Sequence, residues 1–279
     1  MKGKKSLFLA TMISMIFLFL LAGCGSNSTS NEVEKSESDS DVKKVKTEEN
    51  LKLVHDGKLT FAMSGLLKPL NYKENGKLVG FDVEIGTEIA KRIGLEPNPV
   101  TNPWETILQG LKGHKYDVII GSMTATEERL KQVDFSDPYY ISGAQIFIAE
   151  TNDTIQSKED LQGKEIGVMQ ASTHKEVAET LTDKVKGYPS EIFALQDLIP
   201  GRIDAVITDK IVGVSAIKEQ GMKIKTVDSV LNREEIAVAI NKDHEVLLEK
   251  INKAIAEIIE DGTYEKISMK WFGVNIMEN

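Results

Sequence analysis

The chain has 279 residues, of which 41% are hydrophobic, and it carries a formal net charge of −9. An acidic chain lacks the clustered Lys and Arg side chains that nucleic acids and anionic membrane surfaces attract, so we expect no nucleic-acid partner. Cys24 is the single cysteine, which excludes a disulfide within the chain. The apolar content is sufficient for a packed globular body.

The first 24 residues predict an export signal. Three lysines precede an apolar stretch over residues 7–22, and this stretch is too short for a membrane span. Small residues then lead to Cys24, and this arrangement resembles the processing site of bacterial lipoproteins. The resemblance implies cleavage of residues 1–23 and acylation of Cys24, and two acyl chains would give stable membrane anchoring. The alternative is an ordinary signal peptide, or an uncleaved anchor, in which the cysteine is incidental.

Residues 24–50 differ in composition from the rest of the chain. They are rich in serine and mixed charges and contain no aromatic residue, so they cannot bury enough apolar surface to fold. We expect them to form a disordered tether that spans roughly 28 Å as a flexible coil. The remaining body, 51–279, is long enough for two domains.

Apolar periodicity and turn signals predict an alternation of strands and helices along this body. Strands are predicted at 58–62, 95–101, 117–120, 145–149, 165–169, near 185, at 203–207, 224–227 and 236–240. Helices are predicted at 81–93, 104–111, 173–181, 209–219, 246–259 and 263–272. The Asn-Gly pair within 74–77 predicts a tight hairpin turn. Such alternation indicates parallel sheets with helices on both faces, and ligands of these sheets lie beyond the carboxyl ends of the strands.

The strand end at 121–129 is the first candidate site. Thr126 is a natural N-cap, and a capping box would place Glu or Gln at position 129. The chain has Arg129 there, a cation at a helix start, where the macrodipole disfavours it. A bound carboxylate would compensate this charge, with help from the hydroxyls of Ser122 and Thr124. A solvated surface arginine explains the spacing equally well.

Two further strand ends lead into helices. In the segment 169–174, Ser172 or Thr173 would cap the following helix, which gives either a second anion-binding terminus or a plain capped helix. Asp209 follows the buried strand at 203–207. It would either cap its own helix or face the ammonium group of a ligand.

Seven short motifs occur one after another along the body. They are GFDVE at 80–84, YDVII at 116–120, TEER at 126–129, DFSDPYY at 134–140, DLQGK at 160–164, GRIDA at 201–205 and DGTY at 261–264. With the three strand ends, they resemble the solute-binding proteins (family 3, polar amino-acid type) of bacterial ABC transporters, in lipoprotein form. The resemblance spans nearly the whole body.

The resemblance implies an α/β, two-lobed fold of the periplasmic-binding-protein type II, with a mixed, mostly parallel sheet in each lobe and two crossover strands as a hinge. The first lobe would comprise 51–142 and 237–279, and the second 143–236. Arg129 would hold the α-carboxylate of a free amino acid, assisted by the backbones of Thr124 and Thr173. Asp209 would pair with the α-ammonium, and Ser122 would add a carbonyl or hydroxyl.

The same resemblance implies the partners and the location. We expect ABC-transporter permease subunits as protein partners, no cofactor, no metal and no catalytic residue. We also expect a monomer that is lipid-anchored on the outer face of the cell membrane. A Gram-positive surface is favoured over a Gram-negative envelope.

The chain departs from the family pattern at several residues that are expected to contact the side chain of the ligand. Leu67 stands where an aromatic residue often stacks, and Ser64 stands where relatives that bind basic amino acids often carry aspartate. Trp104 matches a position that often covers the ligand side chain, and the alternative is a plain core residue. Met169 offers a thioether, and His174 replaces a common polar residue. We therefore expect a ligand with a neutral side chain, for example a sulfur-containing one such as cystine or methionine.

Enzymatic function is the main alternative. Residues 172–175 spell S-x-x-K, but the partner motifs of penicillin-binding proteins do not occur, and the four histidines show no zinc-binding spacing. A dehydratase or lytic enzyme on the same fold would need an acid or base, and Asp209 and His174 are the candidates. A sensory ligand-binding domain is a third class, disfavoured because no membrane-spanning segment follows Cys24.

Overall fold

The computed structural model describes residues 51–228 and 230–277, all of which belong to one compact unit. The predicted signal peptide, Cys24 and the tether lie outside the described residues. No helix in the described part of the chain combines the length and the apolar content that crossing a bilayer requires.

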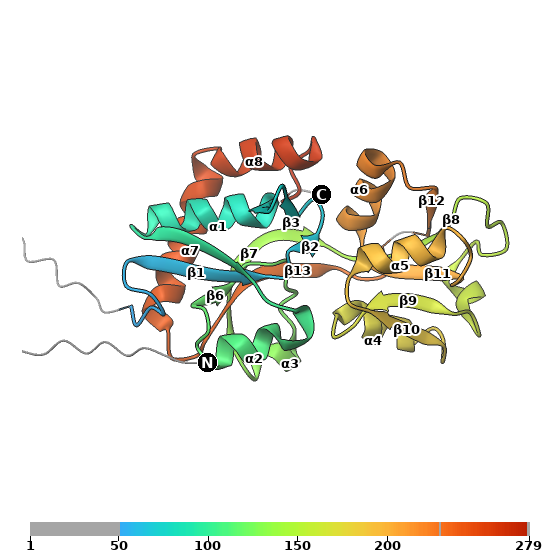
Figure 1. Cartoon of the computed structure of the whole chain (residues 1–279), viewed down its shortest axis with the longest axis horizontal. Coiled ribbons are helices and arrows are strands. Elements are labelled where there is room, and N and C mark those ends of the chain that lie inside the picture. The colour runs from blue at the N-terminus through green and yellow to red at the C-terminus, as the bar shows by residue number, and fades with distance from the viewer. Residues whose placement is uncertain (1–50, 229, 278–279) are drawn as a thin grey trace, which may run out of the picture. The chain divides into compact units, whose positions relative to one another are not determined.

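The described chain forms two five-stranded sheets and one small three-stranded sheet (Figure 1). The first sheet has the order β5-β1-β6-β13-β7 and the second has the order β10-β9-β11-β8-β12. The first sheet contains β1 (Lys58–Met63), β5 (Glu96–Thr101), β6 (Val118–Ile119), β7 (Asp134–Ser142) and β13 (Glu234–Ile240). The second contains β8 (Ala144–Ala149), β9 (Ile166–Met169), β10 (Val185–Tyr188), β11 (Ala205–Asp209) and β12 (Ile224–Val227). The small sheet contains β2 (Leu66–Leu67), β3 (Asn71–Glu74) and β4 (Lys77–Val79).

Helices cover both faces of each large sheet, as Figure 1 shows. We call each large sheet with its helices the first and the second lobe. The first lobe holds α1 (Phe81–Arg92), the 3₁₀ turn η1 (Trp104–Thr106), α2 (Ile107–Lys112), α3 (Glu127–Leu130), α7 (Glu245–Glu260) and α8 (Thr263–Phe272). The second lobe holds the 3₁₀ turn η2 (Lys158–Leu161), α4 (Thr173–Glu179), α5 (Glu191–Leu198) and α6 (Lys210–Gln220). This is the two-lobed α/β fold that the sequence predicts.

Alternation along the strands explains why both faces are covered. In β1, Phe61 packs into the cluster with α1, α7 and α8, while the next residue, Ala62, packs into the cluster with η1 and α2. In the second lobe, Ile207 of β11 faces the α4 side and Val206 faces α5 and α6. Successive side chains of a strand point to opposite faces, so strands buried on both sides are apolar throughout.

The chain crosses between the two sheets twice. It leaves the first sheet in β7, enters the second in β8, and returns in β13, which pairs antiparallel with β7 from Glu234 opposite Ser142 to Ile240 opposite Asp134. Gly143 lies at the first crossing, where an added Cβ would come within 2.1 Å of the Asn232 carbonyl oxygen. Both sheets are mixed, because each combines two parallel with two antiparallel strand pairs. The lobe boundaries at 142/143 and 236/237 stay predictions.

Both ends of the described chain are attached to the first lobe. The Asp117 carboxylate accepts hydrogen bonds from the backbone N–H groups of Val54 and Thr60, each at 2.7 Å. At the other end, Ile276 donates its backbone N–H to the Ser268 hydroxyl and packs into the core beside α8.

The structure has the predicted strands and helices within a few residues, and it adds elements that the sequence pattern did not indicate. The 74–77 hairpin is confirmed, with Asn75 and Gly76 at φ values of 50° and 78°. The largest additions are β7 and α5. In addition, Asp209 is the last residue of β11 as well as the N-cap of α6.

Candidate functional site

A small cavity lies between the two lobes. Its volume is about 20 Å³, which is room for about one water molecule. It is lined by Ser64, Leu67, Leu70, Trp104, Gly121, Ser122, Thr124, Arg129, Met169, Ser172, Thr173, His174, Glu191, Asp209, Glu234 and Ile236. We call it the interlobe cavity. All the predicted ligand-contact residues are among its lining residues, although their individual roles stay predictions.

Arg129 reaches into the interlobe cavity and touches both lobes. Thr126 caps α3 as predicted, because its hydroxyl accepts the Arg129 backbone N–H at 3.2 Å. The guanidinium donates to the carbonyl oxygen of Thr124 at 2.9 Å and to that of Ala171, in the second lobe, at 3.3 Å. It also lies 5.9 Å from the centre of the Trp104 ring. Arg129 is thus half-buried, and its donors point at carbonyl oxygens that line the cleft.

The Ala171 carbonyl oxygen accepts a second hydrogen bond from the first lobe. Trp104 donates its indole N–H to this oxygen at 3.2 Å. Ala171 has a φ of 56°, which is uncommon for a residue other than glycine. Ala171 directly precedes Ser172, the N-cap residue of α4. In the described conformation, this one carbonyl oxygen therefore accepts hydrogen bonds from both Arg129 and Trp104 of the first lobe.

A buried network of hydrogen bonds holds Ser122 in place. Its hydroxyl donates to Asp82 at 2.8 Å, and its backbone N–H donates to the Tyr139 hydroxyl at 3.0 Å. Tyr139 in turn donates to Asp82 at 2.9 Å. Burial raises the pKa of Asp82, and the hydrogen bonds from Ser122, Asn71 and Tyr139 oppose this rise. Because the Ser122 hydroxyl proton is used by Asp82, the Ser122 hydroxyl and carbonyl oxygens are both left as acceptors.

Asp209 caps its own helix, which is one of its two predicted roles, and the contact with a ligand ammonium stays a prediction. One oxygen accepts the Ile211 backbone N–H at 2.6 Å, which caps α6. The side chain also lines the interlobe cavity, and burial raises its pKa to about 6. Ser172 occupies the N-cap position of α4 but does not cap it through its side chain. Its hydroxyl instead donates to the Met169 carbonyl oxygen at 2.7 Å, so the predicted side-chain cap is wrong.

Glu234 lies in the cavity and was missed by the sequence reasoning. Only 3% of this residue is exposed. Its carboxylate accepts the Thr173 hydroxyl at 2.9 Å and the Thr124 hydroxyl at 3.4 Å, and it lies 3.4 Å from His174 Nε2. Burial opposes protonation of His174, but Glu234 outweighs it and raises the pKa of the imidazole. Glu234 follows Arg233 and precedes Glu235, a charge run that reads as solvent-exposed in sequence.

Glu191 is the second missed carboxylate. It is the first residue of α5, is 3% exposed and lines the cavity. Burial raises its pKa to about 7, against the opposing effect of His174. Its Oε2 atom is buried without a hydrogen-bond partner in the described residues. The sequence signal was the Pro-Ser pair before it, which marks a helix start.

The cavity can hold charged ligand groups of both signs. Arg129 supplies a cation from the first lobe, and Asp209 and Glu191 supply carboxylates from the second. Within 51–228 and 230–277, no group of three or more His, Cys, Asp or Glu side chains is arranged to hold a metal ion. Opposite charges from two lobes that line one cavity are suited to a small dipolar molecule.

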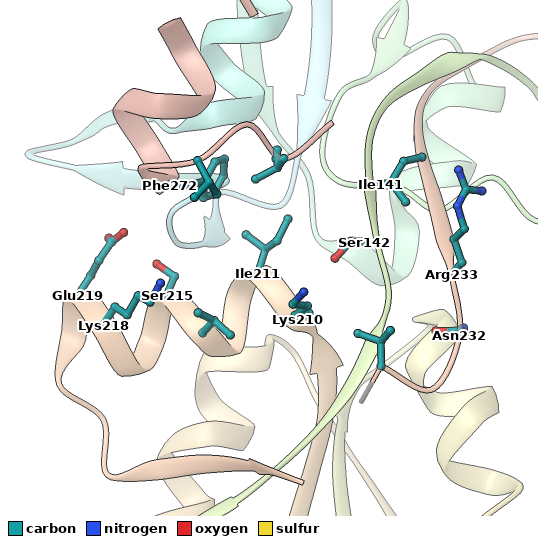
Figure 2. Close-up of a pocket in the computed structure, with 14 residues that line it drawn as sticks. Ile141, Ser142, Lys210, Ile211, Ser215, Lys218, Glu219, Asn232, Arg233 and Phe272 are labelled. Carbon is teal, nitrogen blue, oxygen red and sulfur yellow. The ribbon is translucent and has the colours of Figure 1, made fainter. Parts of the chain in front are cut away.

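A second cavity is larger and has a different character. Its volume is about 480 Å³, and it lies between α6, the segment after α8 and the crossing strands (Figure 2). Figure 2 shows Ile211 of α6 and Phe272 of α8 on its two sides, with Lys210 and Lys218 along α6. We call it the hinge cavity. None of the predicted ligand-contact residues lines it, so we take the interlobe cavity as the candidate site.

An enclosed cavity between two α/β lobes, lined by charged side chains from both, defines a two-lobed ligand-binding protein. Residues 59–274 match the family model of bacterial extracellular solute-binding proteins, family 3, and the chain belongs to this family. It is 34% identical over 232 residues to the L-cystine-binding protein TcyJ of Escherichia coli (strain K12), covering 81% of this chain and 86% of TcyJ.

Two solved structures are similar to the chain. An ancestral arginine-binding protein bound to glutamine is 41% identical, with a TM-score of 0.74, and the match covers 78% of this chain and 99% of that one. The ancestral amino acid-binding protein AncCDT-1, a precursor of cyclohexadienyl dehydratase, is 32% identical, with a TM-score of 0.73. That match covers 77% of this chain and 96% of AncCDT-1.

Proposed function

We propose that this protein captures a free amino acid in the interlobe cavity, outside the cytoplasm, and delivers it to an ABC importer. The observation that carries the proposal is the pair of opposite charges, Arg129 and Asp209, which line one cavity from opposite lobes. An amino acid zwitterion is costly to bury unless each of its charges is paired. Arg129 would pair with the α-carboxylate and Asp209 with the α-ammonium.

Binding would be coupled to lobe closure. Neither lobe alone offers both charges, so the zwitterion stabilises the closed form over the open one, as a ligand-driven shift requires. The described cavity is too small for an amino acid, because it has room for about one water. The contacts of Arg129 and Trp104 with the Ala171 carbonyl would therefore give way when a ligand enters.

For the ligand we propose an amino acid that is neutral overall, with cystine as the leading candidate. Met169 and Leu67 supply soft, apolar surface to the cavity, and Ser64 places no carboxylate where basic side chains are often held. The similarity to a protein named for L-cystine supports this choice. The similarity to an arginine-binding protein bound to glutamine makes arginine and glutamine the necessary competitors in a test.

We further propose that the protein works as a monomer, anchored to the outer face of the cell membrane through acylated Cys24. The support is the sequence around Cys24 and the extracellular character of the family. Catalysis is not part of the proposal. Asp209 and His174, the candidate acid or base, already have roles as an ammonium partner and as the partner of Glu234.

A panel of ligands tests the proposal. The chain without its predicted signal peptide is melted in the presence of each of the twenty amino acids and cystine, and binders are then measured by calorimetry. A ligand at about 100 times its Kd should stabilise the protein by roughly 2.7 kcal/mol. If no amino acid binds, the proposed function is wrong. If arginine or glutamate binds tightest, the function stands but the choice of a neutral ligand is wrong.

A further inference from the structure

Glu191 is a buried carboxylate in the interlobe cavity, and its Oε2 atom has no hydrogen-bond partner within the described part of the chain. It stands at the start of α5, where Ser190 caps the helix by accepting the Ile192 backbone N–H at 3.2 Å. A carboxylate is favoured at a helix N-terminus by the macrodipole, but such residues usually stay in water. Burying an unpaired carboxylate oxygen is costly, so we expect a partner that the protein alone does not supply.

The other charges of the cavity already have partners. Glu234 is paired with His174 across 3.4 Å. In the proposed function, Arg129 takes the ligand α-carboxylate and Asp209 takes the α-ammonium. When these pairs are made, Glu191 is the carboxylate that remains, and it lies in the same enclosed space.

We propose, on the basis of the proposed function, that Glu191 binds a second ammonium group at the far end of the ligand. The substrate class is therefore an amino acid whose side chain ends in an ammonium. Cystine, which is neutral overall, is the member of this class that the proposed function names, and lysine serves as a probe because it also ends in an ammonium. The subsite is defined by Glu191 of α5, with the His174–Glu234 pair beside it in the lining of the cavity.

The geometry favours an ammonium over a guanidinium. The Glu191 carboxyl interacts with its own backbone N–H, and Oε2 is the oxygen without a partner. A guanidinium prefers two carboxylate oxygens in a bidentate arrangement, whereas an ammonium is a compact charge that needs a single acceptor. One available oxygen thus suits a lysine-type or cystine-type end better than an arginine side chain.

Three disulfides that contain cysteine differ only in the groups at their far end, so they test the contribution of the second ammonium to binding. L-Cystine carries both an ammonium and a carboxylate at its far end. The mixed disulfide of L-cysteine with cysteamine keeps only the ammonium, and the mixed disulfide with 3-mercaptopropionate keeps only the carboxylate. Calorimetry on the wild-type protein should show that the first two bind at least about tenfold more tightly than the third. Lysine and methionine form a second pair that differs in the terminal ammonium.

The variant Glu191→Gln removes the charge and keeps the size of the side chain. It should weaken the binding of cystine and of the cysteamine disulfide by about tenfold or more. The affinity for the 3-mercaptopropionate disulfide should change little. It should not weaken the unliganded fold, since it removes an unpaired buried charge. Glu179→Gln, at an exposed glutamate of α4, is the matched control and should change no affinity.

The outcomes separate this inference from the proposed function. If methionine binds as well as the ligands with a second ammonium, or if Glu191→Gln weakens all three disulfides equally, the subsite is wrong while amino-acid capture stands. If the wild-type protein binds no amino acid or disulfide, both fail. The wild-type comparison of the two mixed disulfides decides the matter even if the variant does not fold.

Discussion

The two cavities of this protein differ in size and in kind, and we propose that the smaller one carries the function. The hinge cavity holds about 480 Å³ and is walled mainly by apolar side chains such as Ile211 and Phe272. The interlobe cavity holds about 20 Å³ and is lined by Arg129 and by carboxylates from the second lobe and β13. The buried charges that line a cavity are therefore a better guide to a binding site than the volume of the cavity. When two lobes close on each other, the volume between them mainly reflects the degree of closure.

The crossing strands separate the two cavities. Arg233 lines the hinge cavity, and its neighbour Glu234 lines the interlobe cavity. Asn232 also lines the hinge cavity, so the segment that returns to the first lobe forms part of the wall of both cavities. A rotation of the lobes about this segment should therefore enlarge one cavity as it narrows the other.

Removal of Arg129 should have the largest effect. Arg129→Ala should lower amino-acid affinity by about 2–5 kcal/mol, because a buried ligand carboxylate would lose its countercharge. Calorimetry measures this loss, and a thermal melt without ligand should stay nearly unchanged. The control is Arg233→Ala, an arginine of the hinge cavity, which should keep its affinity. Equal losses in the two variants would break the distinction between the cavities.

Changing the pH should move stability and affinity in opposite directions. Burial raises the pKa of Glu191 to about 7 and that of Asp209 to about 6, so between pH 5 and 8 the folded state binds these protons more tightly than the unfolded chain. The free energy of unfolding of the unliganded protein should thus fall as pH rises, by up to about 3 kcal/mol from Glu191 alone. His174 adds to the same trend, because its pKa is also raised.

Amino-acid affinity should instead rise over this range, since the carboxylates pair with ammonium groups once they are charged. Chemical denaturation and calorimetry at pH 5, 6, 7 and 8 measure the two curves. In Glu191→Gln the stability curve should flatten. A pH-independent stability would contradict the assignment of Glu191 as a buried, unpaired acid.

Filling the hinge cavity should have the smallest effect. Ser215 is buried there, and its hydroxyl has no partner in the described residues. Ser215→Val adds apolar volume to a space that should be widest when the lobes are closed, so affinity should rise a few-fold, by about 0.5–1 kcal/mol. Ser215→Ala removes the hydroxyl without filling the space and serves as the control. If both variants bind like the wild type, the hinge cavity does not report on closure.

Local patterns predicted the elements of the fold, whereas the two-lobed arrangement and the roles of the site residues were implied by the family resemblance. Apolar periodicity marked most strands and helices, and Thr126 and Arg129 broke a local rule in a way that singled them out. Glu191 was missed because α5 was not recognised, so its first residue had no predicted place. Glu234 was missed because its burial depends on the pairing of β13 with β7, a contact between residues about ninety positions apart. Charged residues buried by such long-range pairing look like surface residues in sequence.

The attachment of both chain ends to the first lobe has a mechanical consequence. Asp117 fixes the entry of the described chain at Val54, and Ser268 fixes its exit at Ile276. A pull applied at either end is therefore borne by these hydrogen bonds and by the core behind them, and the second lobe carries none of the load. In the proposed closure, the second lobe would therefore move without straining either of these two attachments.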